Sequence, residues 1–235
     1  MIRTPWQPDF PDTIIDRSLG DATTHSDYTA AKAGNTAAAL RLAQDLVSDA
    51  GMVKVRALAG DKTAVLLPVL AEESTGRNKI PLAIAEVIGC RLGWQVATDV
   101  VQITRVSRTG SKGWHRLAYP PQFDGNIDPS CRYVLIDDTQ TQGGTFAALK
   151  GHIEYQGGSV IGAYALTGKQ YSVQLRLNSD TLNQLRQQHG DLENWWRTRF
   201  GYGFDALTEW EARFILNART TTETVRNRII AAGNG

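Results

Sequence analysis

Two adjacent carboxylates, Asp137 and Asp138, follow the apolar run 133–136 and precede the paired glycines Gly143 and Gly144. An ionised carboxylate at the end of a buried strand is costly unless it has a partner, and it can only accept hydrogen bonds. Glycines let a ligand approach the backbone closely and use its N–H groups as donors. The stretch therefore predicts a divided site, with acceptors for hydroxyl groups and donors for an anion.

The segment between these two halves is rich in donors, with Thr141 and Thr145 beside the glycines. A loop from a strand into a helix presents unpaired N–H groups and the positive end of the helix dipole, both suited to phosphate. A ribose 2′,3′-diol would lie one sugar length from a 5′-phosphate, which favours a phosphorylated sugar. The alternative interpretation is an ordinary helix-capping loop of an α/β protein.

The pattern D-D-x-x-T-x-G-G-T after four apolar or aromatic residues resembles the phosphoribosyl-pyrophosphate (PRPP) signature of the type I phosphoribosyltransferases. The resemblance implies that Asp137 and Asp138 bind the ribose hydroxyls. It implies that the following loop binds the 5′-phosphate through Thr139, Thr141, Gln142, Gly143, Gly144 and Thr145. Many family members have Thr where this chain has Gln142, which changes one side-chain contact and leaves the backbone donors in place.

The resemblance covers roughly residues 62–168, and in the family a pyrophosphate-binding loop follows the first core strand. Here that position holds Arg77, Asn78 and Lys79, which could bind pyrophosphate by charge and directed donors. A solvated polar loop is the alternative. Glu72 and Glu73 depart from the expected pattern, because carboxylates beside pyrophosphate are unfavourable unless Mg²⁺ intervenes.

The family's flexible hood corresponds to the long segment 104–129, which lacks convincing periodicity. Its basic residues are Arg105, Arg108, Lys112, His115 and Arg116. Glycines flank Lys112, which joins Asp137 and Asp138 as a predicted catalytic residue. Closure would exclude water and bring positive charge to the leaving pyrophosphate; a solvated basic loop is the alternative.

The acceptor is less readable. Family members place a base near the segment after the last core strand, where this chain has Lys169 and Tyr171. Tyr171 could stack on a base and Lys169 could contact a carbonyl oxygen, although the sequence favours the alternative of a strand-end lysine and a packing tyrosine. Adenine, guanine, uracil, orotate and non-nucleobase amines all stay open.

The reaction implied by the resemblance is displacement of pyrophosphate from PRPP by a nitrogen nucleophile, an expected role in nucleotide metabolism. The implied cofactor is Mg²⁺, held mainly through PRPP, with Asp137 as a candidate ligand.

Composition is that of a folded globular protein, with 42% hydrophobic and 21% charged residues in 235. The net charge of +1 argues against a strong general field for nucleic acid or membranes. Two cysteines are too few for a disulfide framework, and no segment approaches 18 apolar residues. We expect a cytoplasmic protein that is not inserted in a membrane.

Apolar periodicity predicts the elements that position the motif. Strands are expected at 62–70, 94–103, 132–138 and 159–168. Helices are expected at 28–50 with a break at Gly34, and at 80–93, 144–158, 181–200, 207–218 and 221–232. This alternation predicts an α/β fold, a mainly parallel central sheet flanked by helices and followed by a C-terminal helical unit.

Three regions are expected. Residues 1–61 would form an N-terminal arm and helix, 62–170 the phosphoribosyltransferase-like core, and 171–235 a helical extension. Residues 1–28 look like an irregular arm or short hairpin, in which the run Thr13, Ile14 and Ile15 is the only strand candidate. The aromatic cluster at 195–210 is a candidate oligomer interface, and a homodimer is expected.

Two other functions compete with an enzyme. One is a PRPP- or nucleotide-binding regulator, because 207–218 and 219–232 could form a helix-turn-helix-like pair with Arg219, Arg226 and Arg228 facing phosphates. That support for nucleic acid is weak, since two amphipathic helices more often form a packing cap. The other is an effector or toxin-type transferase acting through the same site.

Overall fold

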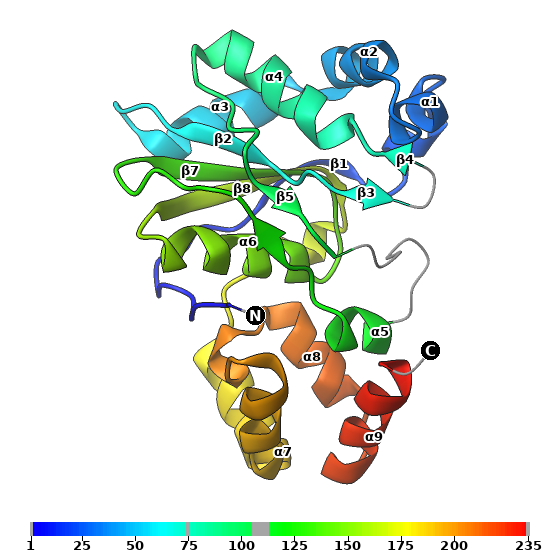
Figure 1. Cartoon of the computed structure of the whole chain (residues 1–235), viewed down its shortest axis with the longest axis vertical. Helices are drawn as coiled ribbons and strands as arrows, with labels where there is room; N and C mark the ends of the chain where they lie inside the picture. Colours follow the sequence, from blue (N-terminus) through cyan, green and yellow to red (C-terminus); the bar gives the residue numbers. More distant parts are fainter. Residues whose placement is uncertain (1, 74–75, 105–112, 234–235) are drawn as a thin grey trace.

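The computed structural model describes residues 2–73, 76–104 and 113–233, and its centre is a four-stranded sheet in the order β1-β8-β7-β2 (Figure 1). The strands are β1 (Ile14–Ser18), β2 (Val65–Pro68), β7 (Arg132–Gln140) and β8 (Ser159–Gly168). All three neighbouring pairs are parallel. The predicted α/β class with a parallel sheet is confirmed.

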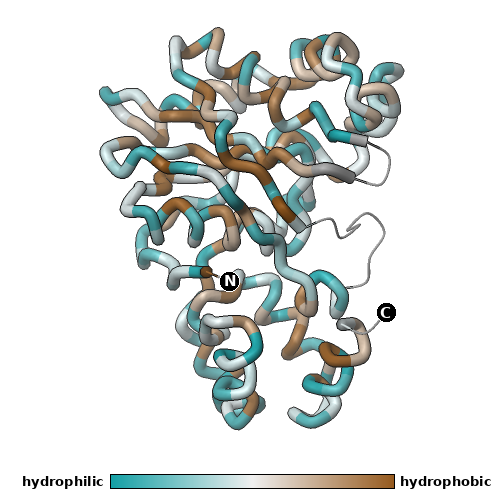
Figure 2. Tube along the Cα trace, viewed as in Figure 1, coloured by the Kyte–Doolittle hydropathy of each residue, from teal (hydrophilic) through white to brown (hydrophobic). Residues whose placement is uncertain are grey.

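Alternation along β7 distributes its side chains to two hydrophobic layers. Val134 and Ile136 pack with the helices on one face, whereas Tyr133 and Leu135 pack on the other. All four are almost fully buried, so both faces of the strand are covered. The near-continuous apolar run is typical of a parallel strand with helices on both sides, and Figure 2 shows the hydrophobic residues concentrated along these strands.

One face of the sheet is covered by the first four helices. These are α1 (Tyr28–Lys32), α2 (Thr36–Leu46), α3 (Asp49–Ala59) and α4 (Ile80–Leu92). The predicted break at Gly34 is confirmed, and the Asn35 side chain caps α2 by accepting a hydrogen bond from the Ala38 N–H. Pro81 stands in the first turn of α4, where its missing N–H costs nothing.

The other face carries α6 (Gly144–Tyr155), and beyond it lies a helical layer (Figure 1). We call this layer the C-terminal unit; it comprises α7 (Ser179–Phe200), a 3-10 turn (Phe204–Ala206), α8 (Glu209–Asn217) and α9 (Thr222–Ala232). The short helix α5 (Gly113–Ala118) packs with it through Leu117. The predicted C-terminal helices are confirmed. No helix in the described ranges is long and apolar enough to cross a membrane.

The aromatic cluster forms the core of this unit. Trp196, Phe200, Tyr202 and Phe204 are buried, and the Trp196 and Phe200 rings lie 4.7 Å apart. The expectation that this cluster forms an oligomer interface is therefore wrong for these four rings, because their apolar area is already covered within the chain. The expected homodimer stays a prediction without that support.

The N-terminal residues differ from the expected arm or hairpin. β1 is an edge strand of the central sheet, paired in parallel with β8 from Ile14 beside Tyr164 to Ser18 beside Gly168. The strand candidate at 13–15 thus overlaps β1, but the local sequence did not indicate its place in the central sheet, because the partner lies about 150 residues away and parallel pairing leaves no turn signal.

The expected strand at 94–103 is also interrupted. Residues 95–97 run beside β2, where the Leu66 N–H donates to the Gln95 carbonyl and the Ala97 N–H to the Leu66 carbonyl. Thr98 and Asp99 are exposed, and the chain then forms the short β5 (Val101–Gln102), antiparallel to β6 (Phe123–Asp124). A second two-stranded sheet joins β3 (Glu72–Glu73) to β4 (Gly76–Arg77). The segment predicted to be a featureless loop thus contains α5 and β6.

Candidate functional site

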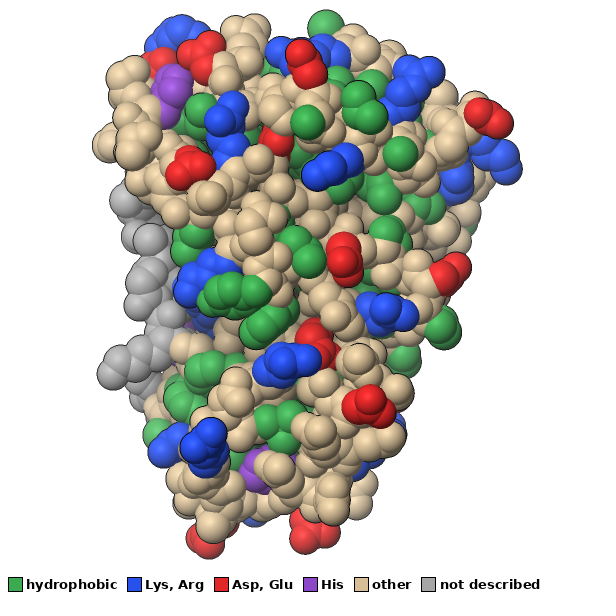
Figure 3. All heavy atoms as spheres, turned by 180° about the vertical axis from the view of Figure 1, so that it is seen from behind, with side chains coloured by type: hydrophobic (Ala, Val, Ile, Leu, Met, Phe, Trp, Pro, Cys, Tyr) green, Lys and Arg blue, Asp and Glu red, His purple; other side chains and the backbone are tan. Residues whose placement is uncertain are grey.

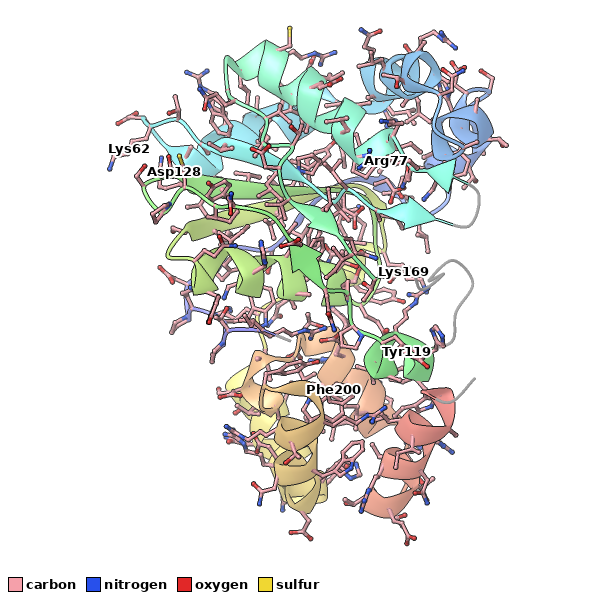
Figure 4. All side chains as sticks on the ribbon, in the orientation of Figure 1. Lys62, Arg77, Tyr119, Asp128, Lys169 and Phe200 are labelled. Carbon is pink, nitrogen blue, oxygen red and sulfur yellow. The ribbon has the colours of Figure 1, made fainter. Side chains whose placement is uncertain are left out.

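A cavity of about 420 Å³ opens at the carboxyl edge of the sheet. Its wall includes Leu19 after β1, Val69 and Ala71 after β2, and the end of β7 with the loop that follows. Ligands of open parallel sheets bind at this edge, because successive loops meet there. Figure 4 shows Arg77 and Lys169 toward this edge, and Lys62 and Asp128 at the opposite end of the sheet.

The carboxylates at the end of β7 face opposite layers, because neighbouring side chains of a strand alternate. Asp138 continues the row of Ile136 and turns toward the layer of α1 and α4. There its Oδ2 lies 2.8 Å from the Lys32 ammonium nitrogen and accepts a hydrogen bond of 2.8 Å from the Asn78 side-chain amide. The side-chain oxygen of Asn78, Oδ1, in turn accepts a hydrogen bond from the Ile80 N–H at the start of α4. The Asp138 carboxylate is therefore fixed in orientation by Asn78, and its charge is balanced by Lys32.

Asp137 has a different environment although it is the next residue. Burial and the adjacent charge of Asp138 raise the pKa of Asp137 well above its usual range, while Lys32 and the Asp138 N–H oppose the shift. That N–H donates to Asp137 Oδ1 at 2.8 Å. The charged form of Asp137 is therefore costly at this position.

The loop after the carboxylates runs directly into the N-terminus of α6. Gly143 adopts a left-handed conformation with φ of 78°, and a Cβ there would lie 2.2 Å from a methyl carbon of Leu175. Gly143 is the N-cap residue and has no side chain to cap the helix, so the first N–H groups of α6 stand next to a glycine at the positive end of the helix dipole. Residues 139–145 all line the cavity. The positive end of the α6 dipole therefore points into the cavity.

The C-terminal unit holds this loop from outside. The Thr208 hydroxyl donates to the Gln142 carbonyl and also caps α8, where Glu211 completes a capping box. Glu211 forms two hydrogen bonds, of 2.6 and 3.0 Å, with the Arg3 guanidinium, which also donates to the Gly144 carbonyl at 3.2 Å. A Cβ at position 144 would lie 2.4 Å from a Glu211 oxygen, which explains the glycine.

A cation reaches the loop from a third direction. Arg116 of α5 lines the cavity, and its Nη1 donates to the Thr141 hydroxyl at 2.6 Å. Partial burial lowers the pKa of the Arg116 guanidinium.

The structure brings together most of the predicted carboxylate and phosphate residues. Lining the cavity are Asn78, Asp137, Asp138, Thr139, Thr141, Gln142, Gly143, Gly144 and Thr145. The Thr139 hydroxyl lies 3.0 Å from that of Thr167 on β8, so it already has a partner within the sheet.

Other predicted residues lie outside the cavity wall. Arg77 is exposed and Lys79 half-buried, and neither lines the cavity. His115 of α5 packs against the ring of Tyr119, which directly follows that helix. Tyr171 is exposed and contacts the Trp210 ring, with the Lys169 ammonium 5.4 Å from the Tyr171 ring centre. Arg105, Arg108 and Lys112 lie outside the described residues.

Several lining residues were not found from the sequence, most clearly Tyr28, Lys32 and Glu211. Lys32 ends the short α1 and Glu211 stands in the first turn of α8, both far in sequence from the motif. No local pattern marks them. A lysine beside a helix break and a capping-box glutamate are ordinary helix-end residues.

The donor set fits Mg²⁺ only with help from a ligand. Among the described residues no group of three or more His, Cys, Asp or Glu side chains could hold a metal. Asp137 and Asp138 supply carboxylate oxygens, and Mg²⁺ is commonly bound by one or two carboxylates together with substrate phosphates and water.

Two curated proteins are similar in sequence. Protein TraN of Escherichia coli is 41% identical over 233 residues, which are 99% of this chain and 52% of TraN. An uncharacterized protein of Haemophilus influenzae is 53% identical over 152 residues, which are 65% of this chain and 34% of that protein. The chain therefore spans about half the length of one relative and a third of the other. No protein-family model matches it.

Among solved structures, the neighbours include three phosphoribosyltransferase-type proteins at low identity. Adenine phosphoribosyltransferase of Thermoanaerobacter pseudethanolicus is 19% identical with a TM-score of 0.34, over 59% of this chain and 72% of that one. UMP synthase of Leishmania donovani is 14% identical with a TM-score of 0.32, over 77% and 33%. Orotate phosphoribosyltransferase of Mycobacterium tuberculosis is 14% identical with a TM-score of 0.27, over 67% and 88%.

Proposed function

We propose that this chain binds PRPP and transfers its 5-phosphoribosyl group to a nitrogen nucleophile. The observation that carries the proposal is that both halves of the D-D-x-x-T-x-G-G-T motif line one cavity: the carboxylates near the end of β7, and the glycine-rich N-terminus of α6. A diol and a phosphate on one sugar match acceptors and donors placed in this way.

At the ribose, Asp138 accepts a hydroxyl hydrogen bond. Lys32 and Asn78 both bind its Oδ2, which fixes the orientation of the carboxylate and assigns Oδ1 to the sugar. Asp137 accepts from the second hydroxyl. Because the reaction develops positive charge on the ribose ring, an ionised carboxylate nearby stabilises the transition state more than the ground state.

At the phosphate, the 139–145 loop supplies backbone N–H groups and the Thr141 and Thr145 hydroxyls. Holding the 5′-phosphate fixes the ribose so that the nucleophile and the leaving group stand on opposite sides of the anomeric carbon. The carbon–oxygen bond to pyrophosphate breaks, a carbon–nitrogen bond forms, and the nitrogen releases its proton to solvent.

The leaving group carries the largest negative charge in the reaction. Mg²⁺ bound to the PRPP oxygens would neutralise part of that charge, with Asp137 as the candidate protein ligand. From the chain itself, Asn78 borders this side of the cavity and Lys32 brings a cation. Arg77 and Lys79 flank Asn78 and remain proposed pyrophosphate contacts, as Lys112 remains a proposed catalytic cation.

Lys169 and Tyr171 remain the proposed acceptor-binding pair. Tyr171 is 58% exposed and follows the carboxyl end of β8, and its ring already contacts Trp210, so a base would extend this aromatic pair. A nucleobase is the acceptor that fits an exposed aromatic ring beside a cation.

The first experiment measures PRPP binding by calorimetry with Mg²⁺ present, then pyrophosphate release with a panel of nucleobases and amines. Products are read by mass spectrometry. We expect micromolar binding and release with one class of acceptor. Asp138→Asn should abolish turnover while leaving the fold intact, because the amide still reaches Asn78 but brings no charge to the sugar.

Asp128→Asn is the matched control, since Asp128 is exposed at the opposite end of the sheet (Figure 4). It should behave as the wild type. Full turnover and unchanged PRPP affinity in Asp138→Asn would overturn the assignment.

Binding without turnover would favour the regulatory alternative. The C-terminal helices give that alternative little support, since the guanidiniums of Arg226 and Arg228 lie 5.5 Å from the ring centres of Trp195 and Trp114. Arginines stacked on their own protein's rings are typical of a packing cap. Basic and acidic side chains are also interspersed over the face seen in Figure 3.

A further inference from the structure

Arg116 is the feature of the cavity that the motif does not account for. It belongs to α5, 25 positions before Thr141, yet its guanidinium nitrogen donates to the Thr141 hydroxyl at 2.6 Å. That hydroxyl lies in the loop where we place the 5′-phosphate. The guanidinium is thus within one hydrogen bond of the proposed anion site.

Arg116 lines the cavity from α5 and is half-buried there. Burial lowers the pKa of its guanidinium. The loop beside it is the part of the cavity rich in anion donors, so an anion bound by that loop would lie close to the Arg116 cation.

The position of Arg116 is set by the C-terminal unit. The Trp114 ring packs edge-on against the Phe214 ring of α8, with 4.9 Å between the ring centres. The Arg228 guanidinium also lies over the Trp114 ring, 5.5 Å from its centre. The Tyr119 hydroxyl donates to the Gly233 carbonyl at 2.5 Å. At Gly113 a Cβ would lie 2.4 Å from the Phe214 ring, so the start of α5 packs closely on α8. These contacts fix the helix from which Arg116 reaches the loop.

We propose that Arg116 binds the 5′-phosphate of the ligand together with the Thr141 hydroxyl, and that the C-terminal unit serves to present it. This inference rests on the proposed PRPP site. It assigns a ligand contact to a residue outside the motif, and a role in binding to helices outside the sheet. A guanidinium suits the task because its planar donors can bind two phosphate oxygens at once.

The test compares three ligands with the wild type, Arg116→Ala and Arg116→Lys by calorimetry. Ribose 5-phosphate carries only the 5′-phosphate, pyrophosphate with Mg²⁺ lacks it, and PRPP with Mg²⁺ has both groups. Arg116→Ala should weaken ribose 5-phosphate and PRPP by a similar factor, roughly 10- to 100-fold for a lost charge-assisted hydrogen bond, and leave pyrophosphate within about 2-fold.

Arg116→Lys keeps the charge without the planar fork, so about 3- to 10-fold weaker binding of ribose 5-phosphate is expected. It also keeps the test usable if Arg116→Ala does not fold. Arg91→Ala is the matched control, because Arg91 is an exposed arginine in the last turn of α4 and does not line the cavity.

Unchanged ribose 5-phosphate affinity in the folded Arg116 variants would overturn this inference and leave the PRPP site intact. A loss confined to pyrophosphate would overturn it too, by moving Arg116 to the leaving group. If the wild type binds neither PRPP nor ribose 5-phosphate, the proposed function itself fails.

Discussion

The two ends of the cavity are built in different ways. The carboxylate end consists of Asp137, Asp138, Lys32 and Asn78, and there the Asp138 carboxylate pairs with the side chains of Lys32 and Asn78. The loop end consists of residues 139–145, from the last residues of β7 to the start of α6, and it is supported from outside by Thr208. In the proposed site, side-chain acceptors would bind the diol, whereas the phosphate would depend on how the loop backbone is held.

Because the two ends are built differently, we expect them to respond to different changes. The carboxylate end balances charges locally, so it should respond to pH and to the loss of Lys32. The loop end depends on its backbone being held, so it should respond to changes in Arg3, Thr208 and Glu211, which need not touch a ligand. The predictions below test that contrast.

Glu211→Ala should have the largest effect. Arg3 and Glu211 are almost inaccessible, with side-chain exposures of 1% and 3%. Removing the carboxylate leaves a buried guanidinium without its counter-charge, which costs about 3–5 kcal/mol of unfolding free energy. Chemical denaturation measures the loss. Glu223→Ala, an exposed first-turn glutamate of α9, should change stability by less than about 1 kcal/mol, and equal losses would refute the buried support of the loop.

Lys32→Met should have the second-largest effect, a loss of roughly 1–3 kcal/mol of unfolding free energy near pH 8. The loss is smaller than for Glu211→Ala because the pair of Lys32 with Asp138 is less deeply buried. Lys32 opposes the raised pKa of Asp137, so its removal raises that pKa further. A carboxyl with a raised folded-state pKa destabilises the fold as pH rises. The difference from wild type should therefore be smallest near pH 4 and grow toward neutral pH.

Lys62→Met is the control for this pH series, since Lys62 is exposed at the other end of the sheet (Figure 4). It should show no such slope. A Lys32→Met loss independent of pH would mean that the lysine acts by packing and not by charge.

Thr208→Val should cost about 1–2 kcal/mol, because it removes the cap of α8 and leaves the Gln142 carbonyl without its donor. Thr221→Val is the comparison variant, since the exposed Thr221 side chain also caps a helix, accepting from the Thr224 N–H at the start of α9. Both should lose stability, but only Thr208→Val should also weaken ribose 5-phosphate. Equal ribose 5-phosphate affinity in the two variants would show that ligand binding by the loop does not depend on the Thr208 contact.

Tyr119→Phe should have the smallest effect, about 0.5–1.5 kcal/mol for one hydrogen bond to the Gly233 carbonyl. It loosens α5 without touching the loop, so ribose 5-phosphate affinity should fall by less than in the Arg116 variants. Tyr155→Phe, on an exposed tyrosine, should be neutral in both measurements.

Much of the fold could be predicted because its signals are local. The apolar run of β7, the Asn35 cap and Pro81 at the start of α4 each depend on near neighbours in sequence. The expected strand at 94–103 was partly wrong, since exposed Thr98 and Asp99 interrupt it. The run at 13–15 was a strand candidate, but its place as the edge strand β1 of the central sheet could not be predicted, because that place depends on the distant partner β8.

The sequence by itself determined the parallel α/β class and the motif that joins two carboxylates to a glycine loop. Both follow from short-range patterns of polarity and backbone freedom. Only the tertiary structure decided that Lys32 would balance Asp138, that Arg116 would reach Thr141, and that Arg3 and Glu211 would support Gly144. These contacts join residues 25 to 208 positions apart. They arise from how helices pack on the sheet, which no local pattern records.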